Sequence, residues 1–210
     1  MTFISDPYEI EKKSFEIIRG LIGEMALTLS ERDVVMRVVH ATADTDFAGA
    51  MVFSKGAVDA GVAAIRSGCC IITDVKMLKA GISPNRPGGS DNNHCFISDI
   101  DVAATARKDG TTRAASAMKK AKCRMDGSIV AIGNAPTALY EVMRMVVEDG
   151  ARPALIVGVP VGFVGAAESK EALLNIGQAP FITNHGRKGG SPVGAAVINA
   201  LIKLAEEQVK

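Results

Sequence analysis

The sequence predicts an α/β fold in which a mainly parallel sheet of about five to six strands lies between two layers of helices. Short apolar runs alternate with helical patterns along the chain, which is typical of strands joined by covering helices. The 210 residues can bury a sizeable core, and 48% hydrophobic with 22% charged residues is an ordinary globular composition. No linker or change of composition divides the chain, so we expect a single domain over residues 1–210.

The first helix is expected over residues 7–21. Asp6 can cap its free amides, and Pro7 suits the first turn. One side of the helix is apolar, and Ser14 lies near the edge of that side. From the residues alone, Ser14 is best interpreted as a small polar residue that the helix tolerates.

The second helix carries the most informative residue of the chain. Ser30 to Asp33 resembles a capping box at its start, and valines at positions 34, 35, 38 and 39 form an apolar stripe. Arg37 and His40 lie one turn apart on another face. A histidine can transfer a proton near neutral pH, but at a helix end it is more often a C-terminal cap.

The rest of the chain alternates between strands and helices. We expect strands over residues 47–53, 70–73, 95–97, 128–132, 154–159 and 181–183. We expect helices over residues 55–65 with Ser54 as the cap, 75–79, 102–107, 111–122 with Arg113 in the first turn, 136–148, 168–174 and 192–207. Ligands of parallel sheets bind at the carboxyl ends of the strands. This rule favours the segments that follow the strands: Ser54, Thr73-Asp74, Ser98-Asp99, Gly133-Asn134, Gly162 and residues 184–191.

Two loops are candidates for ligand binding. The irregular stretch over residues 81–94 is long for a compact domain, and Ser83 and Arg86 are its expected ligand contacts. A surface excursion is the alternative. The stretch Asn184-His185-Gly186-Arg187-Lys188-Gly189-Gly190-Ser191 joins a strand to a helix. Its glycines allow close approach of the backbone, and the helix amides with Arg187 and Lys188 favour an anion.

This anion site lacks the spacing of a Walker loop, and a glycine-rich turn with a solvated basic face is its alternative.

The composition of the chain argues against other classes of function. A net charge of +1, 4% aromatic residues and no Trp argue against a nucleic-acid partner. No segment resembles a signal peptide or a membrane span, and the four cysteines form no C-x-x-C pair, so we expect a reducing cytoplasm.

Metal and nucleophile chemistry have little support in the sequence. His40 with Asp44 and Asp46, and His94 with Cys95, lack a standard zinc spacing, so we expect no protein-bound metal. No serine lies in a G-x-S-x-G elbow.

The string R-V-V-H-A-T-A-D-T-D-F-A, which begins at Arg37, resembles the hallmark of the precorrin-8X methylmutase family. This family includes the cobalt-precorrin-8 methylmutases of cobalamin biosynthesis. Segments 10–18, 133–139 and 184–192 fit the same family in the same order, and together the four segments span nearly the whole chain.

The resemblance implies a flavodoxin-like, three-layer α/β/α fold and an isomerase. The enzyme would move a methyl group from C-11 to C-12 of precorrin-8X, giving hydrogenobyrinate, or of the cobalt form, giving cobyrinate. The shift is intramolecular, so no methyl donor or other cofactor is expected, and cobalt would be present only within the substrate. The resemblance also implies a homo-oligomer whose sites lie near the interface, where the first helix could serve.

The resemblance implies that His40 transfers the proton. It favours Ser14, Arg37 and the 184–191 segment, with Asn184, Arg187, Lys188 and Gly189, for binding of the tetrapyrrole-derived substrate. Ser83 and Arg113 match less distinctively. Two other functions stay open: a corrinoid carrier without turnover, and an α/β enzyme that binds a phosphate-bearing ligand at residues 186–191.

Overall fold

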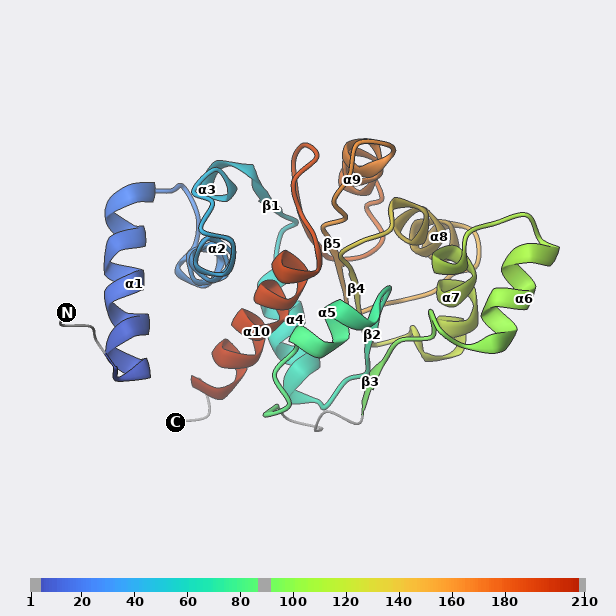
Figure 1. Ribbon diagram of the computed structural model, residues 1–210, viewed down its shortest axis with the longest axis horizontal. Coiled ribbons are helices and arrows are strands. Elements are labelled where there is room, and N and C mark those ends of the chain that lie inside the picture. The colour runs from blue at the N-terminus through green and yellow to red at the C-terminus, as the bar shows by residue number, and fades with distance from the viewer. Residues whose placement is uncertain (1–4, 87–91, 208–210) are drawn as a thin grey trace.

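The computed structural model describes residues 5–86 and 92–207, and in this part of the chain six strands form one sheet (Figure 1). The strands are β1 (Met51–Phe53), β2 (Ile71–Thr73), β3 (Asn93–His94), β4 (Ile129–Ile132), β5 (Leu155–Gly158) and β6 (Phe181–Asn184). Their order in the sheet is β1-β6-β5-β4-β2-β3. Neighbouring strands are parallel except for β1, which runs antiparallel to β6 at one edge. The predicted mainly parallel sheet is confirmed.

The helices of the described residues account for most of the remaining chain. They are α1 (Pro7–Ile22), α2 (Leu29–Thr42), α3 (Phe47–Ala50), α4 (Ala57–Arg66), α5 (Lys76–Gly81), α6 (Ile100–Lys108), α7 (Arg113–Ala121), α8 (Pro136–Val147), α9 (Ala166–Leu174) and α10 (Ser191–Glu207), with the 3-10 turn η2 (Lys122–Arg124). No helix in this part of the chain combines the length and apolarity needed to cross a membrane.

The helices form a layer on each face of the sheet because successive strand side chains point to opposite faces. In β4, Ile129 and Ala131 pack into a core with α2, α4, α5 and α10, whereas Val130 and Ile132 pack into a second core with α7 and α8. All four side chains are 0% exposed. Full burial of a valine or isoleucine side chain contributes roughly 1.5–3 kcal/mol. The three-layer α/β/α arrangement is therefore confirmed.

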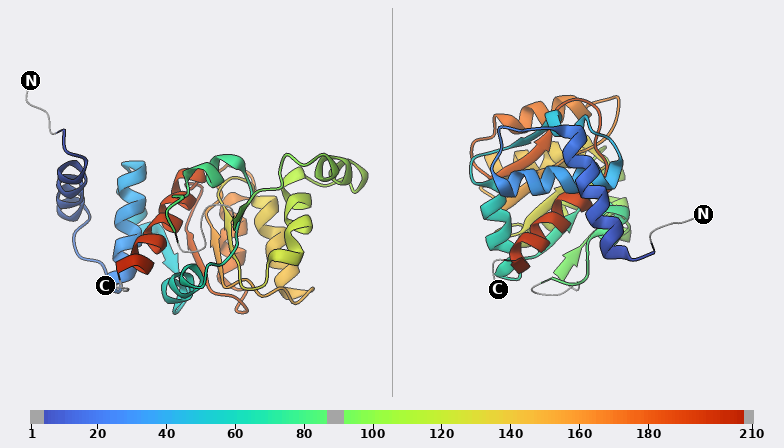
Figure 2. Two further views of the ribbon diagram at one scale, coloured as in Figure 1. Left: turned by 90° about the horizontal axis from the view of Figure 1, so that it is seen from below. Right: turned by 90° about the vertical axis from the view of Figure 1, so that its left-hand side faces the viewer.

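The N-terminal helices extend one layer sideways beyond the sheet. α2 packs against α10, and α1 packs against the outer side of α2 (Figures 1 and 2). Ile18 is the side chain by which α1 is buried in the core. The opposite side of α1 faces outward.

Two expected strands are placed differently. The segment predicted as a strand over 47–53 is divided into α3 and β1. The amides of residues 48–50 donate to the carbonyls of Thr45 and Asp46, so the first half of the segment is helical. The third strand is Asn93–His94 rather than 95–97. The chain turns immediately afterwards, where the amide of Asp99 donates to the carbonyl of Phe96.

Two expected helix caps are also wrong. α2 begins two residues earlier than expected: Thr28 is the cap, and its capping box is completed by Glu31 rather than by Ser30 and Asp33. Ser54 does not cap α4, because its hydroxyl accepts the amide of Phe181.

Candidate active site

His40 lies in the last turn of α2, half-buried at the carboxyl-terminal end of that helix. The helix is capped by Ala43, which adopts a left-handed conformation with φ of 53° and donates its amide to the carbonyl of Val39. This is also the end at which the dipole of the helix is negative.

Two residues of α1 hold the imidazole. The hydroxyl oxygen of Ser14 lies 2.8 Å from His40 Nδ1. The ring of Phe15 stacks on the imidazole, with centroids 5.3 Å apart and planes 10° apart. Ser14 is thus more than a tolerated polar residue. Because Nδ1 is engaged and Nε2 has no hydrogen bond among the described residues, Nε2 is the nitrogen available to a ligand.

Arg37 lies on the same wall of α2, beside Phe15. Its guanidinium carbon is 4.9 Å from the Phe15 ring centroid, and Nη2 is 2.6 Å from Glu11 Oε1. Burial raises the pKa of Glu11, but the hydrogen bond and charge of Arg37, with Lys203 and His40, outweigh burial and hold this pKa below its usual value. Arg37 can bind a substrate carboxylate only by sharing its donors with Glu11.

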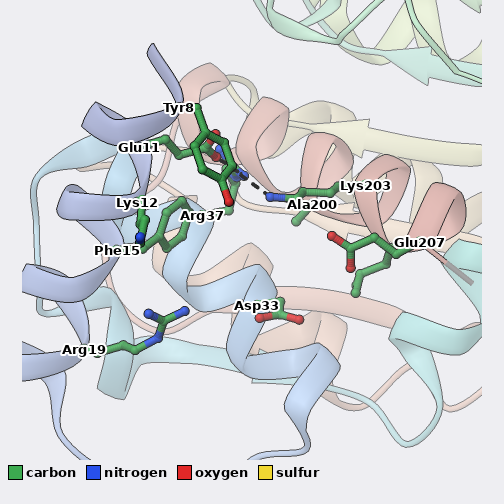
Figure 3. A pocket seen from close by; sticks show the side chains of 11 residues that line it. Tyr8, Glu11, Lys12, Phe15, Arg19, Asp33, Arg37, Ala200, Lys203 and Glu207 are labelled. Atoms are coloured by element: carbon green, nitrogen blue, oxygen red, sulfur yellow. Dashed lines mark ion pairs between the residues drawn. The ribbon is translucent and has the colours of Figure 1, made fainter. Parts of the chain in front are cut away.

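A cavity of about 320 Å³ opens beside this wall, between α1, α2 and α10 (Figure 3). Phe15 and Arg37 line it from the histidine side, and Lys203 and Glu207 line it from α10. Burial, with the nearby charge of Glu207, raises the pKa of Asp33 on its floor. The cavity mixes acids and bases, so it offers no concentrated field for an anion.

The loop between β6 and α10 is shaped by buried contacts. Asn184 is fully buried, and its Nδ2 donates to the carbonyls of His185 and Lys188. Gly189 has φ of 151°, and a Cβ there would overlap the carbonyl oxygen of Val159. Asn184 and Gly189 therefore determine the backbone conformation of this loop.

Lys188 connects this loop to the segment that follows His40. Its Nζ is 2.6 Å from Asp44 Oδ2 and 2.7 Å from Asp46 Oδ2. The hydrogen bond from Lys188 holds the pKa of Asp44 below its ordinary value. Lys188 is thus engaged by two protein carboxylates, whereas Arg187 is exposed and its guanidinium has no hydrogen bond or ion pair among the described residues.

His40, Ser14, Phe15 and Arg37 form the His40 cluster. Three other expected ligand residues do not join it. Arg113 begins α7, on the opposite side of the molecule from α1 and α2 (Figure 1). The Ser83 amide donates to Asn199 Oδ1, and its hydroxyl accepts the amide of Asn85. Arg86 is wrong as a ligand contact, because it is buried and its guanidinium donates inward to the Cys69 carbonyl and to Asn93. Residues 87–91 of that loop lie outside the described residues.

Two side chains near the site were not among the expected site residues. Glu11 and Phe15 lie within a turn of Ser14, and this spacing was the available signal. Asp74 follows a buried strand, as expected of a ligand residue, but its carboxylate accepts the amides of Gly133, Asn134 and Ala135 and so holds the start of α8. Among the described residues, no three His, Cys, Asp or Glu side chains gather as metal ligands.

Comparison with known proteins adds independent findings. A sequence model of the family described as precorrin-8X methylmutase matches residues 9–204. The cobalt-precorrin-8 methylmutase of Methanocaldococcus jannaschii is 46% identical over 209 residues, 97% of this chain and 96% of that relative. The precorrin-8X methylmutase of Pseudomonas aeruginosa is 38% identical over 200 residues, 95% of this chain and 96% of that relative.

The solved structure of a precorrin-8X methyl mutase from Thermus thermophilus has the same fold. The TM-score is 0.88 at 39% identity, and the match covers 96% of this chain and 97% of that one.

Proposed function

The chain belongs to the precorrin-8X methylmutase family, and from this premise we propose that His40 is the catalytic residue. The protein is an isomerase of the corrin pathway, which moves a methyl group from C-11 to C-12 of precorrin-8X or its cobalt form. The product is hydrogenobyrinate or cobyrinate. The family names do not decide between the two substrates, because relatives of both names match this chain.

His40 gives a proton to the conjugated macrocycle and later recovers it. Protonation makes the ring system electron-poor, which eases migration of the methyl group. The bond from the methyl carbon to C-11 breaks and a bond to C-12 forms. The proton then returns to the imidazole, so substrate and product are isomers. Because the methyl group never leaves the macrocycle, the reaction needs no methyl donor and no other cofactor, and any cobalt arrives within the substrate.

The contact between Ser14 and His40 Nδ1 is the observation that carries this proposal. The hydroxyl and the Phe15 ring fix the plane of the imidazole, which leaves Nε2 free to face the substrate. A fixed proton donor avoids the entropic cost of orienting it at each turnover.

Cations around the site bind the acetate and propionate groups of the substrate. Arg187 is the most available of them, because it is exposed and unengaged among the described residues. Arg37 contributes through the donors that it shares with Glu11, while Asn184, Lys188 and Gly189 shape the loop that presents Arg187. Ser83 and Arg113, which lie apart from His40 within one chain, are proposed as further substrate contacts on the family resemblance alone.

We propose that the functional form is a homo-oligomer, since Arg113 lies far from the His40 cluster within one chain and an apolar stripe on α1 is left exposed. Three apolar residues flank Ser14 on α1: Ile10, Ile17 and Leu21, which are 46%, 53% and 66% exposed. A second copy that covers this stripe would bury it and enclose the site. Sedimentation equilibrium of the wild type and Ile17→Glu tests this: the variant should be monomeric. A monomeric wild type would overturn the proposal.

The two other functions are less well supported. A carrier without turnover does not need an oriented histidine, and a phosphate ligand at residues 186–191 would compete with the carboxylates that hold Lys188.

We also propose a cytoplasmic location, which the free state of Cys69, Cys70, Cys95 and Cys123 supports.

Visible absorbance tests the catalytic proposal. Precorrin-8X is mixed with wild type and with His40→Ala, and product binding is measured for both proteins. The wild type should convert the substrate, and the variant should bind the product without turnover. Turnover by the variant at the wild-type rate would overturn the role of His40, and failure of both proteins to bind would overturn the substrate.

A further inference from the structure

A buried lysine lies beneath the loop that follows β6. Lys170, on α9, is 1% exposed, and its ammonium donates to the backbone carbonyl of Lys188 at 2.6 Å. No carboxylate among the described residues lies within salt-bridge distance of this ammonium, and its neighbour Glu171 pairs with His185 instead. Burial lowers the pKa of Lys170 to about 8. Burying an ammonium costs stability, so an apolar side chain of similar length would suit folding better.

The carbonyl that Lys170 contacts is held from two sides. Asn184 Nδ2 also donates to the Lys188 carbonyl, at 2.8 Å. The next two residues lie against Val159, which directly follows β5, because a Cβ on Gly189 would overlap the Val159 carbonyl oxygen and the Gly190 amide donates to that oxygen. The peptide after Lys188 is therefore fixed on its buried side.

The side chain of Lys188 reaches the other way, toward the chain that follows His40. It pairs with Asp44 and Asp46 across 144 and 142 residues of sequence. Asp44 is four residues after His40, and its carboxylate also accepts the amide of Asp46. A continuous series of contacts thus runs from α9 through the loop to the end of α2.

We propose that Lys170 is a positioning residue for the methyl transfer: by holding the Lys188 carbonyl, it fixes the Lys188 ammonium between Asp44 and Asp46 and steadies the helix end that carries His40. The inference rests on the proposed role of His40. It explains why the fold retains a buried charge that folding does not need.

The Lys170→Met variant separates positioning from stability. Asn184 still donates to the Lys188 carbonyl in this variant, so the change strands no buried acceptor. The variant should therefore unfold at the same temperature as the wild type or higher, while its kcat falls about tenfold and its KM changes less. Lys108→Met, which makes the same change at an exposed site on α6, should leave kcat unchanged.

A double-mutant cycle shows whether Lys170 acts through Lys188. Lys188→Met should lower kcat, and the double variant should lose little more activity than Lys188→Met alone. Amide hydrogen exchange over residues 185–190 should accelerate in Lys170→Met, and this readout needs no turnover. If the wild type failed to convert precorrin-8X, the proposed function would fall, and exchange would still report on the positioning contact. The inference would be overturned if Lys170→Met showed unchanged amide exchange, an unchanged kcat or a lower melting temperature. Additive losses of activity in the double-mutant cycle would also overturn it.

Discussion

Ser14 Oγ and His40 Nδ1 lie 2.8 Å apart, although the residues belong to different helices and are 26 positions apart in sequence. The contact joins α1 to the end of α2. It depends on α1 lying against α2 with Phe15 stacked on the imidazole, so the catalytic geometry is set by helix packing.

We predict that Ser14→Ala lowers kcat by about threefold to tenfold, because a hydrogen bond of this kind is worth roughly 0.5–1.5 kcal/mol. Product affinity should change little, since the hydroxyl acts on the imidazole. Single-turnover absorbance with precorrin-8X measures the effect. Ser14→Thr, which keeps the hydroxyl, should retain more activity, and Ser98→Ala is an exposed control. A wild-type kcat in Ser14→Ala would contradict the assignment.

Gly189→Ala should destabilise the loop between β6 and α10. A Cβ would overlap the Val159 carbonyl oxygen, and φ of 151° is strained for an L residue. We expect a loss of about 1–3 kcal/mol in unfolding free energy and a large loss of activity. Urea denaturation measures it against Gly186→Ala, where φ is also positive but the space is open. Equal losses in the two variants would show that overlap with Val159 is unimportant.

Asp74→Ala should be among the more destabilising single changes. The carboxylate accepts three backbone amides at the start of α8 and is fully buried, so its loss strands those donors. We expect a loss of about 3–5 kcal/mol, measured by urea denaturation, with Asp59→Ala on the exposed side of α4 as control. A loss below about 1 kcal/mol would argue against this capping role.

Lys170 should leave a signature in the pH dependence of stability. Its pKa is about 8 in the folded protein and has an ordinary value of 10.5. Between these values the unfolded chain binds more protons, so the unfolding free energy rises with pH by up to about 1.4 kcal/mol per pH unit. Below about pH 8 the cost of the buried charge is fully present. Thermal melts from pH 7 to 10 should show this rise in wild type relative to Lys170→Met, and parallel curves would contradict it.

The fold could be predicted where burial is continuous. β4 is apolar along its whole length because both faces of the sheet are covered, and its predicted position over 128–132 differs from the structure by one residue. The strand predicted over 47–53 was partly wrong, because hydrogen bonds to the carbonyls of Thr45 and Asp46 make the first half of this apolar segment helical. The local pattern of apolar residues does not show such competing backbone hydrogen bonds.

The candidate site could be predicted only in part. His40 and Arg37 share one helix, so spacing relates them directly. The partners of Lys188 and the ammonium contact of Lys170 depend on segments that approach only in the folded chain. Arg86 was misjudged for the same reason, since a loop arginine can turn inward when buried carbonyls are within its reach.

The most direct test of the account follows the methyl group itself. Precorrin-8X labelled with ¹³C in its C-11 methyl group is incubated with wild type or His40→Ala, and the label is located by NMR. The label should move to C-12 with the wild type and stay at C-11 with the variant, although the variant still binds the product. Migration at comparable rates in both proteins would show that His40 does not transfer the proton.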